Sequence, residues 1–230
     1  MLGTVVNALS IVAGTAVGLI LKSGIRDNYR ETIMNAIGLS VLLIGMIGAI
    51  KTNDLLLLIF SLAIGSVIGE ALKIEDRLAG LGKLIESKTS STDGSVAKAF
   101  VTSSLVFCVG SMAIVGSIES GLTGNHQTLF AKAVLDGIVS IFLSSTLGFG
   151  VIFSAAAVFV YQGIITLLSS SLKAFLTDAM IREISAVGGV LIMAIGLNML
   201  NIKKIKVGNM LPAIILPFFY FFFKKAFGIG

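Results

Sequence analysis

The chain has 230 residues, of which 56% are hydrophobic and only 13% charged, and its mean hydropathy is +1.02. The charged share is about half that of a soluble domain, so the composition indicates a protein that lies almost entirely in a membrane. The absence of Trp and the few aromatic residues other than Phe argue against a nucleic-acid-binding platform. The single Cys108 excludes an internal disulfide framework.

Apolar segments of bilayer length recur along the whole chain. They lie at about 3–21, 33–50, 54–72, 99–118, 129–147, 151–170, 184–201 and 208–223. We therefore predict an all-α polytopic membrane helical bundle, a single integral membrane domain over 1–230 with eight spans. The alternative is seven spans, because only three residues separate the fifth and sixth segments and one of them could be re-entrant. The first segment starts without a basic region before it, so a cleaved signal peptide is not expected.

A polar connection at 73–98 separates a first half, 1–72, from a second half, 99–230. Its apolar residues continue at helical spacing through Ile85, which predicts an amphipathic helix along the membrane interface. With eight spans, eleven Lys and Arg residues lie on the side of this loop and six on the other side. The loop is therefore predicted to be cytoplasmic and the protein to lie in the inner (plasma) membrane, with both termini outside. In a seven-span arrangement with the N-terminus outside and the C-terminus inside, twelve Lys and Arg residues lie inside and five outside. Charge alone therefore does not choose between seven and eight spans.

An internal repeat relates two of the apolar segments. Residues 33–45 align without gaps on residues 184–196, and the shared positions include Gly38 with Gly189 and Gly45 with Gly196. In the eight-span arrangement these two helices cross the membrane in opposite directions, as in transporters with inverted-topology repeats. The alternative is chance similarity between two helices rich in Gly, Ile and Leu.

Asp136 is the only charged residue between Ala133 and Leu172, and a carboxylate in hydrocarbon costs about 2.5–3.5 kcal/mol even on insertion scales. Ser140 and Ser144 follow on the same helical face. A carboxylate above hydroxyl oxygens suits a hard cation such as sodium, and it suits a proton relay equally well. In this interpretation Asp136→Asn should preserve folding, since the amide is easier to bury. The alternative is an i, i+4 ion pair with Lys132 near the interface, worth about 0.2–0.5 kcal/mol.

Further polar residues complete the candidate ion, proton or substrate site. The amides lie inside spans and need hydrogen-bond partners there, whereas the carboxylates lie near span ends, where a solvated side chain is the alternative. These residues are Asn7, Gln162, Asn198, Glu119 and Glu70. His126 has no cysteine or second histidine to complete a metal site, so neither a metal nor a cofactor is expected.

Two pairs of glycines predict faces for close helix packing. Gly14 with Gly18, and Gly65 with Gly69, have the small-xxx-small spacing that lets helix backbones approach within a chain or across a homo-oligomer.

Several motifs resemble one family of bacterial and archaeal membrane proteins, known as domain of unknown function 554. The motifs cover the chain from end to end, and they include residues 1–7, 64–70, 108–116, 119–124, 131–137, 161–163 and 208–213. The resemblance implies a polytopic inner-membrane protein of transporter type. It implies no particular substrate and no catalytic residues.

The sequence favours a secondary transporter or channel for a small solute or ion, coupled to protons or sodium through Asp136. The absence of a GxxxxGK[ST] motif argues against ATP hydrolysis, and no nucleophile–base pairing or metal set indicates an enzyme. The competing hypothesis is a membrane scaffold or accessory subunit, with the glycine faces as partner interfaces. The expected partners are the lipid bilayer, the solute or ion, and a second copy of the chain.

Overall fold

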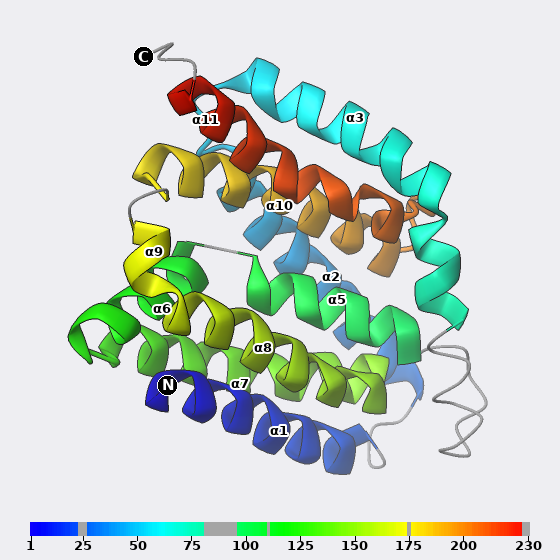
Figure 1. The fold of residues 1–230 in the computed structure, drawn as a ribbon. Helices are drawn as coiled ribbons and strands as arrows, with labels where there is room; N and C mark the ends of the chain where they lie inside the picture. Colours follow the sequence, from blue (N-terminus) through cyan, green and yellow to red (C-terminus); the bar gives the residue numbers. More distant parts are fainter. Residues whose placement is uncertain (23–26, 81–95, 110, 174–175, 227–230) are drawn as a thin grey trace.

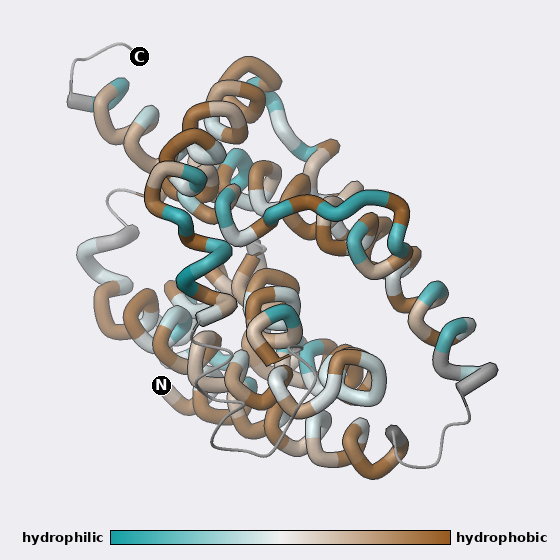
Figure 2. Tube along the Cα trace, turned by 90° about the vertical axis from the view of Figure 1, so that its right-hand side faces the viewer, coloured by the Kyte–Doolittle hydropathy of each residue, from teal (hydrophilic) through white to brown (hydrophobic). Residues whose placement is uncertain are grey.

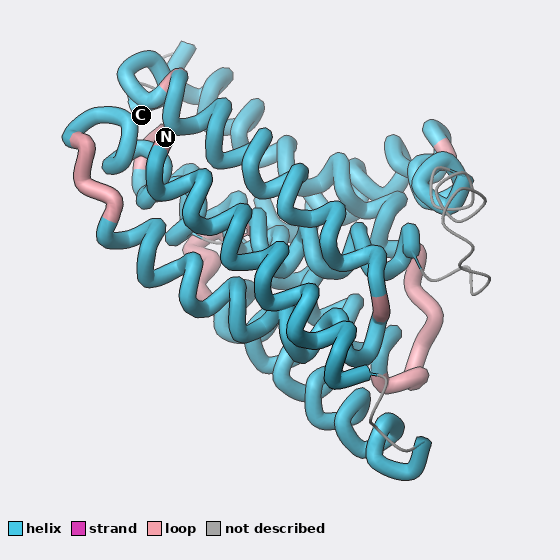
Figure 3. Tube along the Cα trace, turned by 90° about the horizontal axis from the view of Figure 1, so that it is seen from below, coloured by secondary structure: helices cyan, strands magenta, loops and turns pink. Residues whose placement is uncertain are grey.

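The computed structural model describes residues 1–22, 27–80, 96–109, 111–173 and 176–226, and these residues form a bundle of helices (Figure 1). Seen from below, the described chain is helical almost throughout, with short connections and no strand (Figure 3). The predicted all-α class is therefore confirmed. The elements in chain order are α1 (Leu2–Lys22), α2 (Asp27–Ala49), α3 (Leu55–Leu72), α5 (Val96–Cys108), α6 (Ser111–Thr123), α7 (Gln127–Leu147), η1 (Phe149–Ile152), α8 (Phe153–Leu167), α9 (Ser169–Lys173), α10 (Asp178–Met199), η2 (Val207–Ile215) and α11 (Leu216–Ala226).

The predicted amphipathic helix in the 73–98 connection is present over residues 74–80, directly after α3. Its expected continuation through Ile85 and the loop at 88–94 lie outside the described residues.

Seven helical stretches in the described ranges are long and apolar enough to cross a membrane, and the bent pair α5–α6 makes an eighth. The two helices of this pair meet at an angle of 60°. Length and composition alone leave open whether the pair crosses the membrane, but the directions of its neighbours decide it.

Helix α1 runs parallel to α7. Gly3 faces Leu129, Asn7 bonds to Asp136 and Gly18 faces Ser144, so residue numbers rise together along the two helices. Successive membrane crossings alternate in direction. If only α2 and α3 crossed between α1 and α7, then α7 would run antiparallel to α1. Because it runs parallel, the α5–α6 pair must make one net crossing. The start of α1 and the end of α11 lie at the same end of the bundle (Figure 1), as an even number of membrane crossings requires.

Helix α2 runs antiparallel to α10. Gly38 faces Leu200, Gly45 faces Gly189, and Gly196 faces Leu42. This direction requires α7 and η1–α8 to make an even number of crossings together, and both are long and apolar enough to cross, so the directions favour eight crossings. The opposed directions expected for the two repeat copies are thus confirmed, while a twofold relation between the halves stays a prediction.

The turn between α7 and α8 depends on one glycine. Gly148 has φ 85°, a conformation that glycine adopts without the steric cost of a Cβ. The chain therefore reverses within the short η1 segment, so α7 and α8 are two separate helices that both pack on α1.

Each helix of the first half packs on a helix of the second half. Besides the α1–α7 and α2–α10 pairs, α3 packs on η2, where Gly65 faces Ala213 and Gly69 faces the carbonyl of Asn209. Gly14 meets the carbonyl of Gly137 in the same manner. A Cβ at any of these glycines would overlap backbone atoms of the neighbouring helix. Both predicted glycine faces therefore serve packing within the chain.

The outer surface of the bundle is apolar along the helices. Large side chains such as Ile20, Val67 and Leu167 are 70–73% exposed, as expected where lipid is the solvent. Hydrophilic residues gather in the connections at the end that faces the viewer in Figure 2. We call this the basic end, because the connections after α3 and α10 and the start of α5 bring together Lys73, Lys98, Lys203, Lys204 and Lys206.

Candidate functional site

Asp136 lies near the middle of α7 and is only 5% exposed. Its Oδ2 accepts a hydrogen bond from Nδ2 of Asn7 on α1 at 3.0 Å. Lys132 Nζ lies 2.9 Å from Oδ1 and 2.8 Å from Oδ2. Asp136 therefore points into the bundle, and Asn7 lies opposite it. We refer to Lys132, Asp136 and Asn7 as the Asp136 cluster.

The ion pair with Lys132 exists, but its setting differs from the one expected for it. The two side chains are 9% and 8% exposed, so the pair is buried and not a solvated pair at the interface. Helix α1 packs closely on this part of α7, because Gly3 and Gly14 lie directly against it and Asn7 bonds to Asp136. A buried pair is costly to form, but removing one partner leaves an uncompensated charge and costs about 3–5 kcal/mol.

The two serines below Asp136 bond to their own helix. Ser140 Oγ donates to the carbonyl of Asp136 at 2.6 Å, and Ser144 Oγ donates to the carbonyl of Ser140 at 2.6 Å. Both side chains are fully buried. Their protons are thus held by the backbone in the i−4 pattern common for serine in helices. The hydroxyls line the face below the carboxylate, but they do not extend the cluster by hydrogen bonds.

Gln162 on α8 is fully buried, and neither of its amide atoms has a hydrogen-bond partner among the described residues. Oδ1 of Asn7 is likewise without one. The hydroxyls of Thr4 on α1 and Thr166 on α8 form a hydrogen bond at 3.4 Å. Asn7 lies one helical turn after Thr4, and Gln162 lies one helical turn before Thr166. Leaving a buried polar group unpaired costs about 1–3 kcal/mol, so these amide atoms are available to a ligand.

Both helices of the bent α5–α6 pair pack on α7, the helix that carries Lys132 and Asp136. Cys108 is the last residue of α5. The following Val109 packs against Gly188 of α10, where any larger residue would collide with it. Sequence reasoning missed the burial of Lys132. The i, i+4 spacing of Lys132 and Asp136 was the one signal available.

The other three predicted site residues lie away from the cluster. Glu70, 61% exposed at the basic end, pairs with Lys206 at 3.0 Å, and its carboxylate raises the pKa of Lys206. The amide of Asn198 bonds to both backbone groups of Ile205, at 2.8 and 2.7 Å, and so fastens the connection after α10. Glu119, at the opposite end, accepts from Asn125 and Thr128 at 2.8 and 2.7 Å.

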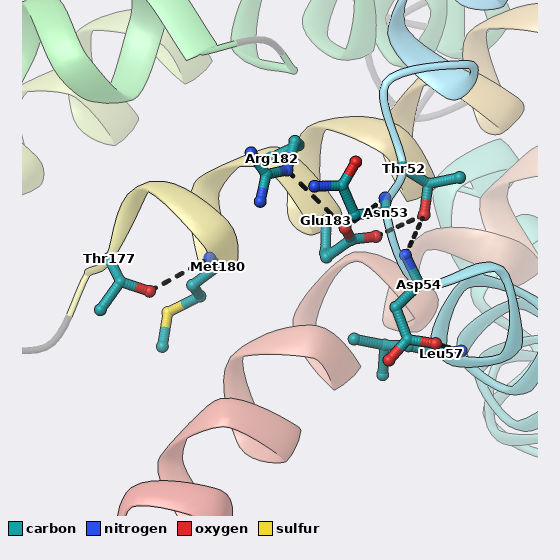
Figure 4. A network of polar contacts seen from close by, with 8 residues as sticks. All are labelled: Thr52, Asn53, Asp54, Leu57, Thr177, Met180, Arg182 and Glu183. Atoms are coloured by element: carbon teal, nitrogen blue, oxygen red, sulfur yellow. Dashed lines mark hydrogen bonds and ion pairs between the residues drawn. The ribbon is translucent and has the colours of Figure 1, made fainter. Parts of the chain in front are cut away.

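A buried carboxylate at the opposite end was also missed as a polar centre. Glu183, 2% exposed on α10, accepts hydrogen bonds from the Thr52 hydroxyl at 2.5 Å and from the Asn53 backbone at 2.8 Å (Figure 4). Side-chain caps at Asp54 and Thr177 begin α3 and α10 in the same region. Glu183 therefore clamps the α2–α3 connection onto α10.

We expect Glu183→Ala to lower the free energy of unfolding by about 2 kcal/mol, because two partly buried donors of the α2–α3 connection lose a charged acceptor. Glu31→Ala is the matched control, since Glu31 precedes the other repeat copy and is exposed. Denaturant titration in detergent measures both. Equal stabilities for the two variants would contradict the clamp.

The family model described as "Protein of unknown function (DUF554)" matches residues 2–222. The chain belongs to this family. It is 38% identical over 235 residues to "Uncharacterized membrane protein YdfK" of Bacillus subtilis (strain 168), an alignment that covers 100% of this chain and 99% of that protein. It is 27% identical over 221 residues to "Uncharacterized protein YqgA" of Escherichia coli (strain K12), with 94% of each chain covered. No solved structure matches. The resemblance and the membrane class expected from the sequence are thereby confirmed.

Proposed function

We propose that this protein is a secondary transporter for a small solute or ion in the cell's inner membrane, coupled to protons or sodium through Asp136. One observation carries the proposal. A buried Lys132–Asp136 pair bonds to Asn7, whose Oδ1 has no partner in the described chain, and α1 packs on α8, where the buried amide of Gln162 also lacks one. No catalytic role and no cofactor form part of it.

The Lys132–Asp136 pair offers a physical means of coupling. A proton or a sodium ion that reaches Asp136 competes with the Lys132 ammonium for the same carboxylate oxygens. Once the carboxylate is occupied, the ammonium is buried without its partner, a state that costs several kcal/mol. A rearrangement that gives Lys132 another partner or water then becomes favourable. Occupancy of Asp136 would thereby shift the equilibrium between two conformations.

The α2–α10 interface supports an inverted repeat in this proposal. Gly45 faces Met193. In the repeat alignment Gly45 corresponds to Gly196 and Met193 to Leu42, and Gly196 faces Leu42. Transporters with inverted repeats place discontinuous helices beside their substrate sites. The bent α5–α6 pair, which packs on the helix that carries Lys132 and Asp136, fits that arrangement. Under the positive-inside rule the basic end is the cytoplasmic one.

The scaffold hypothesis loses the feature on which it depended. It needed glycine faces open to a partner, whereas Gly14, Gly18, Gly65 and Gly69 pack against other helices of the same chain. The buried polar groups, in contrast, are a cost that a passive scaffold does not need.

The proposal is tested by solute accumulation in proteoliposomes under an imposed pH or sodium gradient, with the retained solutes identified by mass spectrometry. We expect the parent to accumulate a solute and the neutral variant Lys132→Met/Asp136→Asn to lose this accumulation. The matched control is Lys206→Met/Glu70→Gln, which neutralises a second lysine–carboxylate pair whose side chains are 60% and 61% exposed. Unchanged accumulation in a monodisperse Asp136 double variant would remove the coupling role. A parent that accumulates nothing under either gradient would favour the scaffold hypothesis.

A further inference from the structure

A cavity of about 620 Å³ opens at the basic end, away from the Asp136 cluster. Its wall is built by α5, α10, η2, the connection between α10 and η2, and the helical residues 74–80. This volume lies within the range of about 300–1,000 Å³ that is usual for sites of small organic molecules.

The cavity has a buried floor and a cationic rim. On the floor, Thr102, Ile195 and Val207 are 3–4% exposed, so the cavity reaches into the bundle and does not lie on its lipid-facing perimeter. The rim carries three exposed lysines, and none of them forms an ion pair with another described residue. They are Lys98, Lys203 and Lys204.

The remaining charged and amide groups of the wall are largely committed to the protein itself. Glu75, the one carboxylate among the described residues of the wall, accepts from the backbone N–H of Gly208 at 2.6 Å. The Asn198 side chain is held by Ile205 through both of its amide atoms. The lysines are therefore the charged groups left to meet a ligand, and they outnumber the carboxylate.

We infer that this cavity binds a small organic anion, whose carboxylate or phosphate group meets Lys203 and Lys204 while its apolar part lies on the Ile195 and Val207 floor. A cavity lined by one sign of charge raises the local concentration of ions of the opposite sign. The mixed floor of hydroxyl and aliphatic groups selects a solute with some apolar surface over a bare inorganic ion. The idea that this anion is also the transported solute rests on the proposed function. The binding of the anion in the cavity is independent of that function.

Isothermal titration of the whole chain in a non-ionic detergent tests the site, with benzoate as the probe and benzamide as its neutral isostere. Saturable binding of benzoate is expected, with weaker or no binding of benzamide. The variant Lys203→Gln/Lys204→Gln should lose about tenfold or more in benzoate affinity. The control Lys51→Gln/Lys224→Gln removes the same charge at the opposite end and should bind like the parent.

Lack of saturable benzoate binding, or equal affinity in both double variants, would overturn the inference. The same titration in phosphatidylcholine nanodiscs, with and without phosphatidylglycerol, separates a soluble anion from a lipid headgroup. If phosphatidylglycerol abolishes benzoate binding, the cavity holds a headgroup and the solute site is overturned. If binding persists, the site is supported. Benzoate binding in a parent that accumulates no solute would retain this site while removing the transporter.

Discussion

Asp136→Asn alone should lower the free energy of unfolding by about 3–5 kcal/mol, because the Lys132 ammonium then stays buried without its carboxylate. The amide of Asn fits the space, but it brings no charge to oppose the lysine, 9% of whose side chain is exposed. This outcome differs from the expectation drawn from Asp136 as an isolated carboxylate, for which the amide is the easier group to bury. Denaturant titration in detergent micelles, followed by circular dichroism, measures the loss.

The neutral variant Lys132→Met/Asp136→Asn separates charge balance from packing. Replacing both members of a buried pair with uncharged residues of similar volume is often neutral or stabilising. The double variant should therefore recover most of the stability that the single variant loses. A single variant as stable as the parent would mean that Lys132 reaches water without Asp136, and the coupling argument would lose its energetic basis.

Gly45→Val should lower the free energy of unfolding by about 3 kcal/mol, at the upper end of the usual cost of overpacking. The new side chain would meet the backbone nitrogen of Met193 and the carbonyl oxygen of Gly189, neither of which can turn aside as a side chain can. Helices α2 and α10 would have to separate. The loss is measured by the same denaturant titration.

Two further glycine variants serve as controls for this prediction. Gly80→Val introduces the same residue where no described atom lies within 4 Å, so it should leave stability nearly unchanged. Gly196→Val should behave like Gly45→Val, because Gly196 meets the backbone of Leu42 as Gly45 meets that of Met193. A large effect at Gly45 with none at Gly196 would contradict the reciprocal packing of the two repeat copies.

The sequence was sufficient where a long apolar run coincides with one straight helix. The segments at 54–72 and 129–147 correspond to α3 and α7 within two residues, because hydrocarbon length and polar flanks define both ends. The segment at 99–118 was expected as one helix and is two, α5 and α6, joined at a 60° bend. Hydropathy is the same on both sides of that bend, and its packing against Gly188 of α10 is a tertiary feature that no local pattern contains.

The candidate site also has a part that the sequence predicts and a part that depends on tertiary packing. The burial of Asp136 follows from its isolation among apolar residues, and α1 supplies Asn7 as its partner. The sequence offered an ion pair of Lys132 with Asp136 near the interface only as the alternative, and the buried form of that pair was not expected. Its enclosure depends on how closely α1 approaches α7. The Glu183 clamp and the cavity at the basic end are formed by connections that meet only after folding.

The placement of Lys132 and Asp136 on a single helix has a consequence for biosynthesis. A lone charge at the centre of a span costs about 2.5–3.5 kcal/mol on insertion into the bilayer. Here the two opposite charges lie one turn apart in α7, so the counterion enters the membrane within the same segment. Lateral passage of α7 from the translocon into lipid therefore need not wait for α1 to dock. Had the cation been on another helix, this span would have to be retained in the insertion machinery until its partner arrived.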